Sequence, residues 1–187
     1  MILPPNHCQP LSEMPVLKTP FNDYSVRFSP FYENELVIAT AQNFGILGNG
    51  RVHILQVTPN GPISEVTAFD TTDGIYDICW SEDHDSLIIG ASSDGSLKLY
   101  DLSLPPTNNP ISSFKEHTRE VHSVDYNTVI KDSLLSASWD DTVKLWTVDR
   151  NASVRNFKEH TYCVYSAAWN LRHADIFASA SRDYTMT

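Results

Sequence analysis

A histidine, a serine and an aspartate occur in this chain in a pattern that could support nucleophilic catalysis. His117, Ser136 and Asp140 are the residue types of a Ser-His-Asp triad, in which the imidazole takes the serine proton and the carboxylate orients the imidazole. The same types return 43 residues later, at His160, Ser179 and Asp183. Recurrence at a fixed offset indicates an architectural role, because catalysis needs only one copy. We therefore predict no catalytic residue and interpret these side chains as scaffold.

The recurring residues belong to a longer repeat. The segment E-H-T-R-E-V-H-S-V-D-Y from Glu116 is followed by E-H-T-Y-C-V-Y-S-A-A-W from Glu159. A third copy, at an offset of 46, includes I-Y-D-I-C-W from Ile75, and a more divergent fourth begins with Y-S-V-R-F-S from Tyr24. A period of about 40–45 residues with several short strands is typical of the blades of a WD-repeat propeller. We predict an all-β chain of about four blades, at residues 21–57, 63–102, 111–149 and 154–187.

Each repeat also carries the polar residues that hold such a blade together. In WD repeats a loop histidine, a strand serine, a turn aspartate and an outer tryptophan form a hydrogen-bonded chain. The candidates in the third repeat are His117, Ser136 or Ser138, Asp140 and Trp146, and corresponding residues elsewhere are His160, Asp183 and Asp94. Each hydrogen bond contributes only ~1 kcal/mol net, but a buried member left without a partner costs ~1–3 kcal/mol. The set is therefore expected to fix the geometry of the blade.

Composition excludes several classes of function. Acidic residues outnumber basic ones 23 to 13, which gives a formal charge of −10. Such a surface repels phosphate backbones, so we expect no nucleic acid partner and favour a basic peptide or protein. No apolar run approaches the ~20 residues that span a bilayer. The three cysteines are Cys8, Cys79 and Cys163, an odd and widely spaced set that predicts neither disulfides nor a metal site. We also expect no cofactor.

Several segments narrow the repeat class to one family. They are A-T-A-Q-N-F-G-I-L-G-N-G from Ala39, Y-S-V-R-F-S-P from Tyr24, D-I-C-W-S-E from Asp77 and E-H-T-R-E-V from Glu116. From about Met14 to Tyr184 the chain closely resembles the peroxisomal import receptors for type-2 targeting signals, the peroxin-7 family. Its sequence resembles the plant members of that family most. The resemblance implies a seven-bladed propeller that binds the N-terminal cargo signal R-[LIV]-x5-[HQ]-[LA].

The resemblance also implies partners and a location. Cargo proteins such as peroxisomal thiolase, a co-receptor for C-terminal S-K-L-type signals and the peroxisomal docking machinery are the expected partners. The receptor would cycle between the cytoplasm and the peroxisome, in the matrix or at the membrane, without spanning that membrane. A helical signal with an arginine at one end needs an apolar platform with an acidic group at the matching end.

Residues in the loops before the inner strands and between the next two strands are the candidates for this platform. They are Asp73, Tyr76, Glu120, His122, Trp139, Tyr165 and Arg182. We expect Asp73 and Glu120 to meet the cargo arginine, since both lie just before inner strands of adjacent blades. Trp139 is the leading apolar contact. The alternatives are that the acids are ordinary solvated loop residues and that Trp139 packs between blades.

The number of repeats suggests a partial propeller. Fewer than four complete blades are present where the family has seven, and the 43-residue period places the last expected aromatic at position 189, beyond Thr187. We expect an open arc, with residues 1–13 as a disordered extension, and a chain that aggregates, oligomerises or folds poorly alone. Two other readings are a general WD-repeat scaffold, as in ubiquitin-ligase or chromatin complexes, and a truncated fragment without function.

Overall fold

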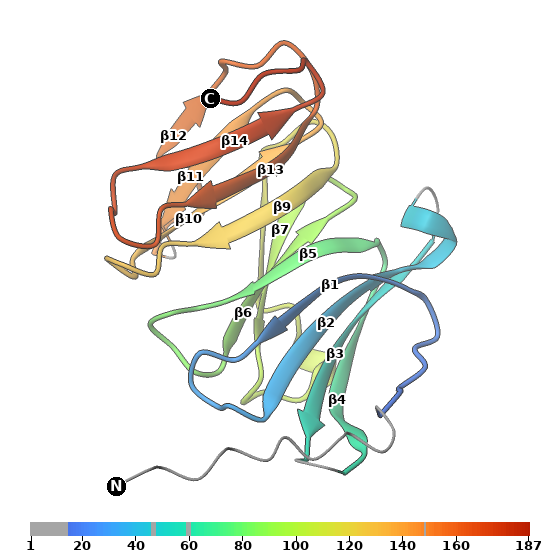
Figure 1. Ribbon diagram of the computed structural model, residues 1–187. Helices are drawn as coiled ribbons and strands as arrows, with labels where there is room; N and C mark the ends of the chain where they lie inside the picture. Colours follow the sequence, from blue (N-terminus) through green and yellow to red (C-terminus); the bar gives the residue numbers. More distant parts are fainter. Residues whose placement is uncertain (1–14, 46–47, 59–60, 148) are drawn as a thin grey trace, which may run out of the picture.

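The computed structural model describes residues 15–45, 48–58, 61–147 and 149–187, which form antiparallel sheets placed side by side (Figure 1). The predicted extension at 1–13 lies outside these residues. Two 3-10 turns, η1 (Gln42–Gly45) and η2 (Pro106–Asn108), are the helical elements of the described part. The first sheet contains β1 (Asn22–Phe28), β2 (Glu35–Ala41), β3 (Gly50–Val57) and β4 (Ile63–Thr71).

The remaining sheets follow in chain order, each beginning with its inner strand. The second sheet contains β5 (Ile75–Trp80), β6 (Leu87–Ser92), β7 (Ser96–Asp101) and β8 (Ser112–Lys115). The third contains β9 (Val121–Tyr126), β10 (Ser133–Ser138), β11 (Val143–Thr147) and β12 (Arg155–Phe157). The fourth pairs β13 (Val164–Trp169) with β14 (Phe177–Ser181). We call these sheets blades 1 to 4.

The arrangement is that of a partial β-propeller. The inner strands β1, β5, β9 and β13 lie next to one another and run in the same direction, from right to left in Figure 1. Each sheet is extended outward from its inner strand by antiparallel neighbours. The sheets are offset from the sequence repeats, because blades 1 to 3 each take their fourth strand, β4, β8 or β12, from the start of the next repeat.

Apolar side chains fill the spaces between neighbouring blades. In β6, Ile88 packs into the cluster shared with blade 1, and Ile89 packs into the cluster shared with blade 3. This is the alternation that a strand buried on both faces requires. A smaller cluster around Leu135 and Val164 joins blades 3 and 4. Burial of each large aliphatic side chain stabilises the fold by roughly 1.5–3 kcal/mol, so the blades are held together mainly by these clusters.

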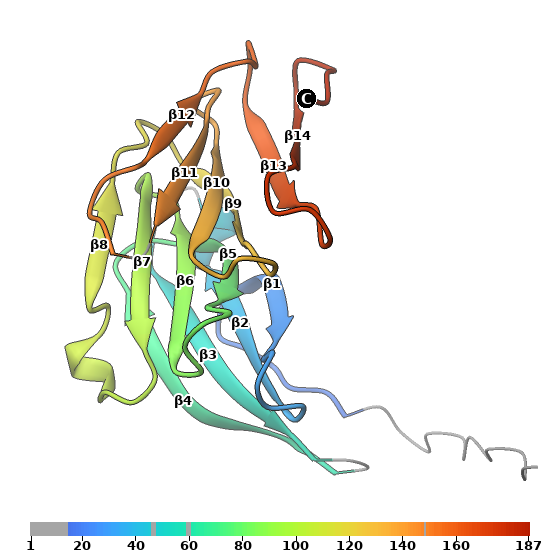
Figure 2. The same ribbon diagram turned by 90° about the vertical axis from the view of Figure 1, so that its left-hand side faces the viewer.

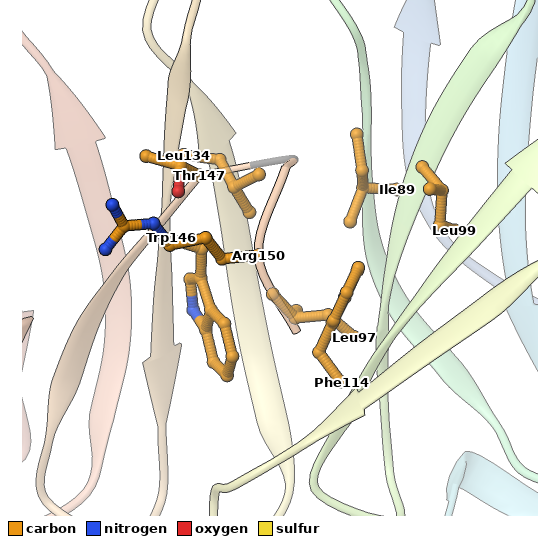
Figure 3. A pocket seen from close by; sticks show the side chains of 8 residues that line it. All are labelled: Ile89, Leu97, Leu99, Phe114, Leu134, Trp146, Thr147 and Arg150. Atoms are coloured by element: carbon orange, nitrogen blue, oxygen red, sulfur yellow. The ribbon is translucent and has the colours of Figure 1, made fainter. Parts of the chain in front are cut away.

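A small cavity lies within the cluster between blades 2 and 3 (Figure 3). Its lining residues are Ile89, Leu97, Leu99, Phe114, Leu134, Trp146, Thr147 and Arg150. Leu97 and Trp146 are almost fully buried. The cavity is a packing gap beside the Trp146 indole, and its mostly apolar walls offer a polar ligand little to bind.

Polar contacts also join the inner strands across blades. Asp77 of β5 accepts hydrogen bonds from the Ser25 hydroxyl of β1, at 2.6 Å, and from the Val124 amide of β9, at 3.0 Å. Asp125 of β9 accepts one from the Trp169 amide of β13, at 2.7 Å. These contacts fix the spacing of the inner strands, and therefore of the side chains at their ends.

Candidate functional site

The triad-like residues of blade 3 form one buried hydrogen-bonded set. His117 Nδ1 donates to Asp140 Oδ2 at 2.8 Å, and its Nε2 lies 2.7 Å from Ser136 Oγ. Trp146 Nε1 donates to the same serine oxygen at 2.8 Å. Because Ser136 accepts from the indole, its own proton is directed to His117 Nε2. Ser136 is 0% exposed, so this hydroxyl cannot meet a substrate, and the set serves the fold.

Blade 4 repeats the histidine, serine and aspartate of the set, and blade 2 keeps only the aspartate. His160 contacts Asp183 Oδ2 at 3.0 Å and Ser179 Oγ at 2.9 Å. In blade 2, Asp94 retains its place in the turn, where it accepts from the Ser96 amide at 3.0 Å and lies 3.5 Å from Lys98 Nζ. Ser138, the other candidate serine of blade 3, instead donates to the Glu120 carbonyl oxygen at 2.8 Å.

The turn aspartates are held in their charged form. Burial by itself raises the pKa of Asp140, but hydrogen bonds from His117 and Thr142 outweigh it and lower that pKa. For Asp94, burial again acts upward, while the Ser96 hydrogen bonds and Lys98 lower the pKa to about 2. A carboxylate that accepts several hydrogen bonds is stabilised as the anion. These acids therefore keep their structural role at neutral pH.

A second group of residues stands at the starts of the four inner strands, and each of its members lies on a β-bulge. In three of these strands the pairing register skips one residue: between Asp23 and Ser25 in β1, between Ile75 and Asp77 in β5, and between Val164 and Ser166 in β13. In β9 the skipped residue lies between Val121 and Ser123, which pair with the consecutive residues Ser138 and Ala137 of β10. The residue skipped in each case is aromatic: Tyr24, Tyr76, His122 or Tyr165. A bulge changes the direction of the side chain it carries.

These side chains form a continuous aromatic row across the blades. Tyr24 meets Tyr76 edge to face, with ring centroids 5.1 Å apart. The imidazole of His122 is stacked between Tyr76 and Trp139, with its centroid 4.3 Å from each. Tyr165 lies edge-on to Trp139 at 6.0 Å and is 43% exposed. We name Tyr24, Tyr76, His122, Trp139 and Tyr165 the aromatic row.

The row contains four of the seven residues proposed from the sequence, together with Tyr24, which sequence reasoning missed. The signal for Tyr24 was present, because the repeat alignment already places it opposite Tyr76. Trp139 enters from the turn between β10 and β11, where its amide donates to the Glu120 carbonyl oxygen at 3.0 Å. It stacks on His122 and is partly exposed.

The charged candidates differ in their positions. Glu120 immediately precedes β9, and its carboxylate lies 3.8 Å from Arg119 Nε. Its charge contributes to raising the pKa of Tyr76, after burial and Tyr24, which places it beside the row. Asp73 is directed elsewhere, since it accepts from the Thr72 hydroxyl at 2.7 Å and lies 3.8 Å from Lys98 Nζ.

Arg182 occupies the position in blade 4 that Trp139 occupies in blade 3. Its amide donates to the Cys163 carbonyl oxygen at 2.9 Å, matching the bond from Trp139 to Glu120. Its guanidinium lies over the ring of Tyr162, 5.2 Å from the centroid, as a cation–π pair. Arg182 thus borders this end of the molecule with a positive charge, whereas Glu120 supplies a negative one.

The environment of the row keeps His122 neutral. Burial between two rings lowers the pKa of His122 to about 4, against a smaller upward effect of Glu120. A neutral imidazole stacked between aromatic rings gives a flat, apolar surface with one carboxylate beside it. Such a surface suits an apolar side chain next to a cation, and nothing in it supplies a nucleophile.

Over residues 15–45, 48–58, 61–147 and 149–187, no three histidine, cysteine or acidic side chains lie close enough to hold a metal ion. Within those ranges no helix is long and apolar enough to cross a membrane. Cys79 and Cys163 are free thiols, both buried.

The fold and the repeat place the chain in a known class. Residues 55–101 and 108–147 match the family described as WD domain, G-beta repeat. The chain therefore contains WD40 repeats, folded as blades of a partial propeller.

Curated relatives narrow the class further. The chain is 64% identical over 142 residues to "Peroxisome biogenesis protein 7" of Arabidopsis thaliana, covering 75% of this chain and 45% of that protein. Proteins named "Peroxisomal targeting signal 2 receptor" are 49% identical in Dictyostelium discoideum and 41% in Homo sapiens, over 67% and 70% of this chain and 40% of each relative. The chain is thus a homologue of these receptors that spans less than half of their length.

Proposed function

We propose that this chain takes part in recognising type-2 peroxisomal targeting signals, and that the aromatic row with Glu120 is where the signal binds. The observation that carries the proposal is the row itself, in which each inner strand places an aromatic side chain on a bulge at the same end of the blade. The names of the relatives support the choice of ligand.

The expected signal has a chemistry that complements the row. Its pattern, R-[LIV]-x5-[HQ]-[LA], places apolar side chains along one face of a helix and an arginine at one end. The apolar face would lie on His122, Trp139 and Tyr165, and the guanidinium would meet Glu120. Arg119 now neutralises part of the Glu120 charge at 3.8 Å, so the cargo arginine would displace it. Asp73 is the weaker candidate for this contact because it already faces Lys98.

A charge reversal at Glu120 tests the assignment. We expect Glu120→Lys to weaken binding of a synthetic nonapeptide of this pattern by about 2–5 kcal/mol, because it removes the partner of the arginine and adds a repelling charge. Fluorescence anisotropy with labelled peptide measures the change.

The matched control places the same charge change at the other end of the blades. Asp132→Lys, in the exposed loop between β9 and β10, should leave the affinity within about twofold, since exposed charges more than ~10 Å apart are largely screened. Unchanged affinity in Glu120→Lys would remove Glu120 from the site. Equal binding of a peptide with alanine in place of the arginine would instead favour a general WD-repeat scaffold.

The wider role follows from the same assignment. We infer a receptor that binds cargo such as peroxisomal thiolase, acts with the co-receptor for S-K-L-type signals and with the docking machinery, and cycles between cytoplasm and peroxisome. A non-enzymatic role fits the buried position of Ser136. Co-precipitation with the co-receptor, in the presence and absence of signal peptide, tests the partner assignment.

A further inference from the structure

The loops at the opposite end of the inner strands share one rigid turn. In each blade the loop between the first two strands begins with a serine or asparagine whose side chain accepts hydrogen bonds from the amides two and three residues later. Ser29 and Ser81 do this through Oγ, at 3.1–3.2 Å. Asn127 and Asn170 do it through Oδ1, at 2.8–3.2 Å. Four successive blades therefore present the next side chains from the same backbone frame.

Direct contacts join these loops into one surface. The Tyr32 hydroxyl of blade 1 donates to Asp85 of blade 2 at 2.7 Å. Lys131 of blade 3 lies 3.8 Å from Glu82 of blade 2. The side-chain Nδ2 of Asn127 donates to the Ala174 carbonyl oxygen of blade 4 at 3.0 Å. The four loops face the viewer together in Figure 2.

The side chains on this frame are exposed and differ from blade to blade. The two presented residues are Phe31 and Tyr32 in blade 1, Asp83 and His84 in blade 2, Val129 and Ile130 in blade 3, and Arg172 and His173 in blade 4. Val129 is 42% and Ile130 50% exposed. Blade 3 has a neighbouring blade on each side, so the exposure of this aliphatic pair belongs to the loop itself and does not reflect a terminal sheet.

The surface formed by these loops is negatively charged at its centre and apolar on either side. It therefore complements a ligand that carries a cation between apolar groups. The four loops, residues 29–34, 81–86, 127–132 and 170–176, carry six carboxylates and two cationic side chains, Lys131 and Arg172. The acidic loop of blade 2 stands between the aromatic pair of blade 1 and the aliphatic pair of blade 3. The side chain of Asp83, in this acidic loop, is 62% exposed. Among the described residues it forms one ion pair, with its neighbour His84, whose Nε2 lies 3.4 Å from Asp83 Oδ2.

We propose that these four loops form a second binding surface, for a protein segment that places a lysine or arginine between apolar side chains. The aliphatic pair Val129 and Ile130 supplies the apolar contact, and Asp83 receives the cation. A rigid frame lowers the entropic cost of binding, because little has to be ordered. The excess of carboxylates disfavours an anionic bilayer, the other class of partner that exposed apolar loops could meet.

The test uses the whole chain with unlabelled type-2 signal peptide in excess, which occupies the aromatic row, and a labelled synthetic amphipathic peptide of leucine and lysine as the probe, titrated by fluorescence anisotropy. We expect Val129→Ser with Ile130→Ser to weaken binding at least tenfold, and Asp83→Asn to weaken it about threefold with a smaller salt dependence. The matched control is Val66→Ser with Val154→Ser, two other exposed valines, which should change binding less than twofold. Thermal melts by circular dichroism establish that both double variants are folded.

Three results would overturn the proposal. One is equal weakening by the two double variants, which would mean general stickiness. Another is equal affinity for a peptide with glutamate in place of lysine. The third is sedimentation with phosphatidylserine vesicles that depends on Val129 and Ile130, which would identify a bilayer as the partner. Binding of the type-2 signal peptide should be unchanged in Val129→Ser with Ile130→Ser, so this surface and the aromatic row are tested separately.

Discussion

Blades 2 and 3 have the same strand order but are held by different interactions. In blade 3, His117, Ser136 and Trp146 form a buried polar chain that ends on Asp140. The corresponding positions of blade 2, 46 residues earlier, hold Thr71, Gly90, Tyr100 and Asp94. A Cβ on Gly90 would lie 3.1 Å from Ile75 and 3.4 Å from Tyr100, so the space of the missing serine is filled by apolar packing.

Blade 2 compensates with charge at its turn. Asp94 lies 3.5 Å from Lys98 Nζ and 3.7 Å from Lys115 Nζ, and Asp73 is 3.8 Å from Lys98. Blade 3 is thus fixed by a buried hydrogen-bonded network that ends on a charged aspartate, and blade 2 by ion pairs at its turn. The Ser-His-Asp set is therefore one of two ways to build a blade in this chain, and its recurrence has an architectural explanation that does not involve catalysis.

The largest expected effect is the loss of the network in blade 3. Substitution His117→Ala removes the hydrogen bonds of the imidazole to Asp140 and Ser136 and leaves the buried Ser136 hydroxyl without an acceptor. We expect the free energy of unfolding to fall by about 3 kcal/mol, measured by urea denaturation. The matched substitution in blade 2, Thr71→Ala, should cost less than about 1 kcal/mol. Equal costs at the two positions would mean that the network is not what distinguishes the blades.

The next effect concerns pH, because blade 3 has His122 where blade 2 has Tyr76. The pKa of His122 is lowered to about 4 by burial, while an unfolded histidine has a pKa of about 6.5. The unfolded state therefore takes up the proton first, and the stability contributed by the neutral ring is lost as the pH falls from about 6.5 towards 4. We expect a loss of about 1–2 kcal/mol for this partly exposed ring.

The variant His122→Tyr makes blade 3 resemble blade 2 at this position and separates the two cases. Urea denaturation at pH 7, 6 and 5 should show a decline in the original chain and a nearly level response in the variant. The turn aspartates do not interfere in this range. The pKa values of Asp94 and Asp140 are lowered, so their contributions are lost only as the pH falls below about 4. A decline of the same size in both chains would place the titrating group elsewhere.

The blades differ again in their response to salt. Asp94→Asn in blade 2 should cost about 1 kcal/mol at low ionic strength and about half of that in 1 M sodium chloride, since one of its two lysine partners, Lys115, is exposed to solvent. Lys115 is 63% exposed, which makes its contribution easy to screen. Asp140→Asn in blade 3 should cost more and depend little on salt, because its partners are His117 and Thr142. Denaturation at the two salt concentrations compares them.

The fold could be predicted from sequence because its signals repeat. The 43-residue period, the turn aspartates and the alternating strands predicted a chain of propeller blades, and the polar set of blade 3 was proposed from the residues that WD repeats place at these positions. The outer strands could not be assigned in this way. Each of the strands β4, β8 and β12 belongs by sequence to the start of one repeat, but it pairs with the last strand of the repeat before it. That pairing depends on tertiary contacts, which the repeat pattern does not show.

Some residues of the proposed site could be nominated from the sequence for the same reason. Aromatic residues at the second position of an inner strand were visible in the sequence, but the bulges that place them in one row depend on backbone geometry. The direction of the Asp73 side chain could not be predicted from the sequence either. Asp73 and Glu120 looked alike as acids before inner strands, yet Glu120 corresponds by repeat position to Gly74, and Asp73 corresponds to Arg119. A shift of one residue in a loop changes which neighbour a carboxylate meets.

The smallest expected effect lies in the turns of the two blades. Gly95 of blade 2 has φ +87° and its counterpart Asp141 of blade 3 has φ +70°. Glycine adopts this left-handed conformation without the steric cost of a Cβ, which favours the folded state. Glycine also increases the conformational entropy of the unfolded chain, which offsets part of that gain. We therefore expect Asp141→Gly to raise the free energy of unfolding by only about 0.5 kcal/mol. Urea denaturation with replicate titrations can resolve this change, and a clear destabilisation would show that the Asp141 side chain supports the turn and that the two turns are not equivalent.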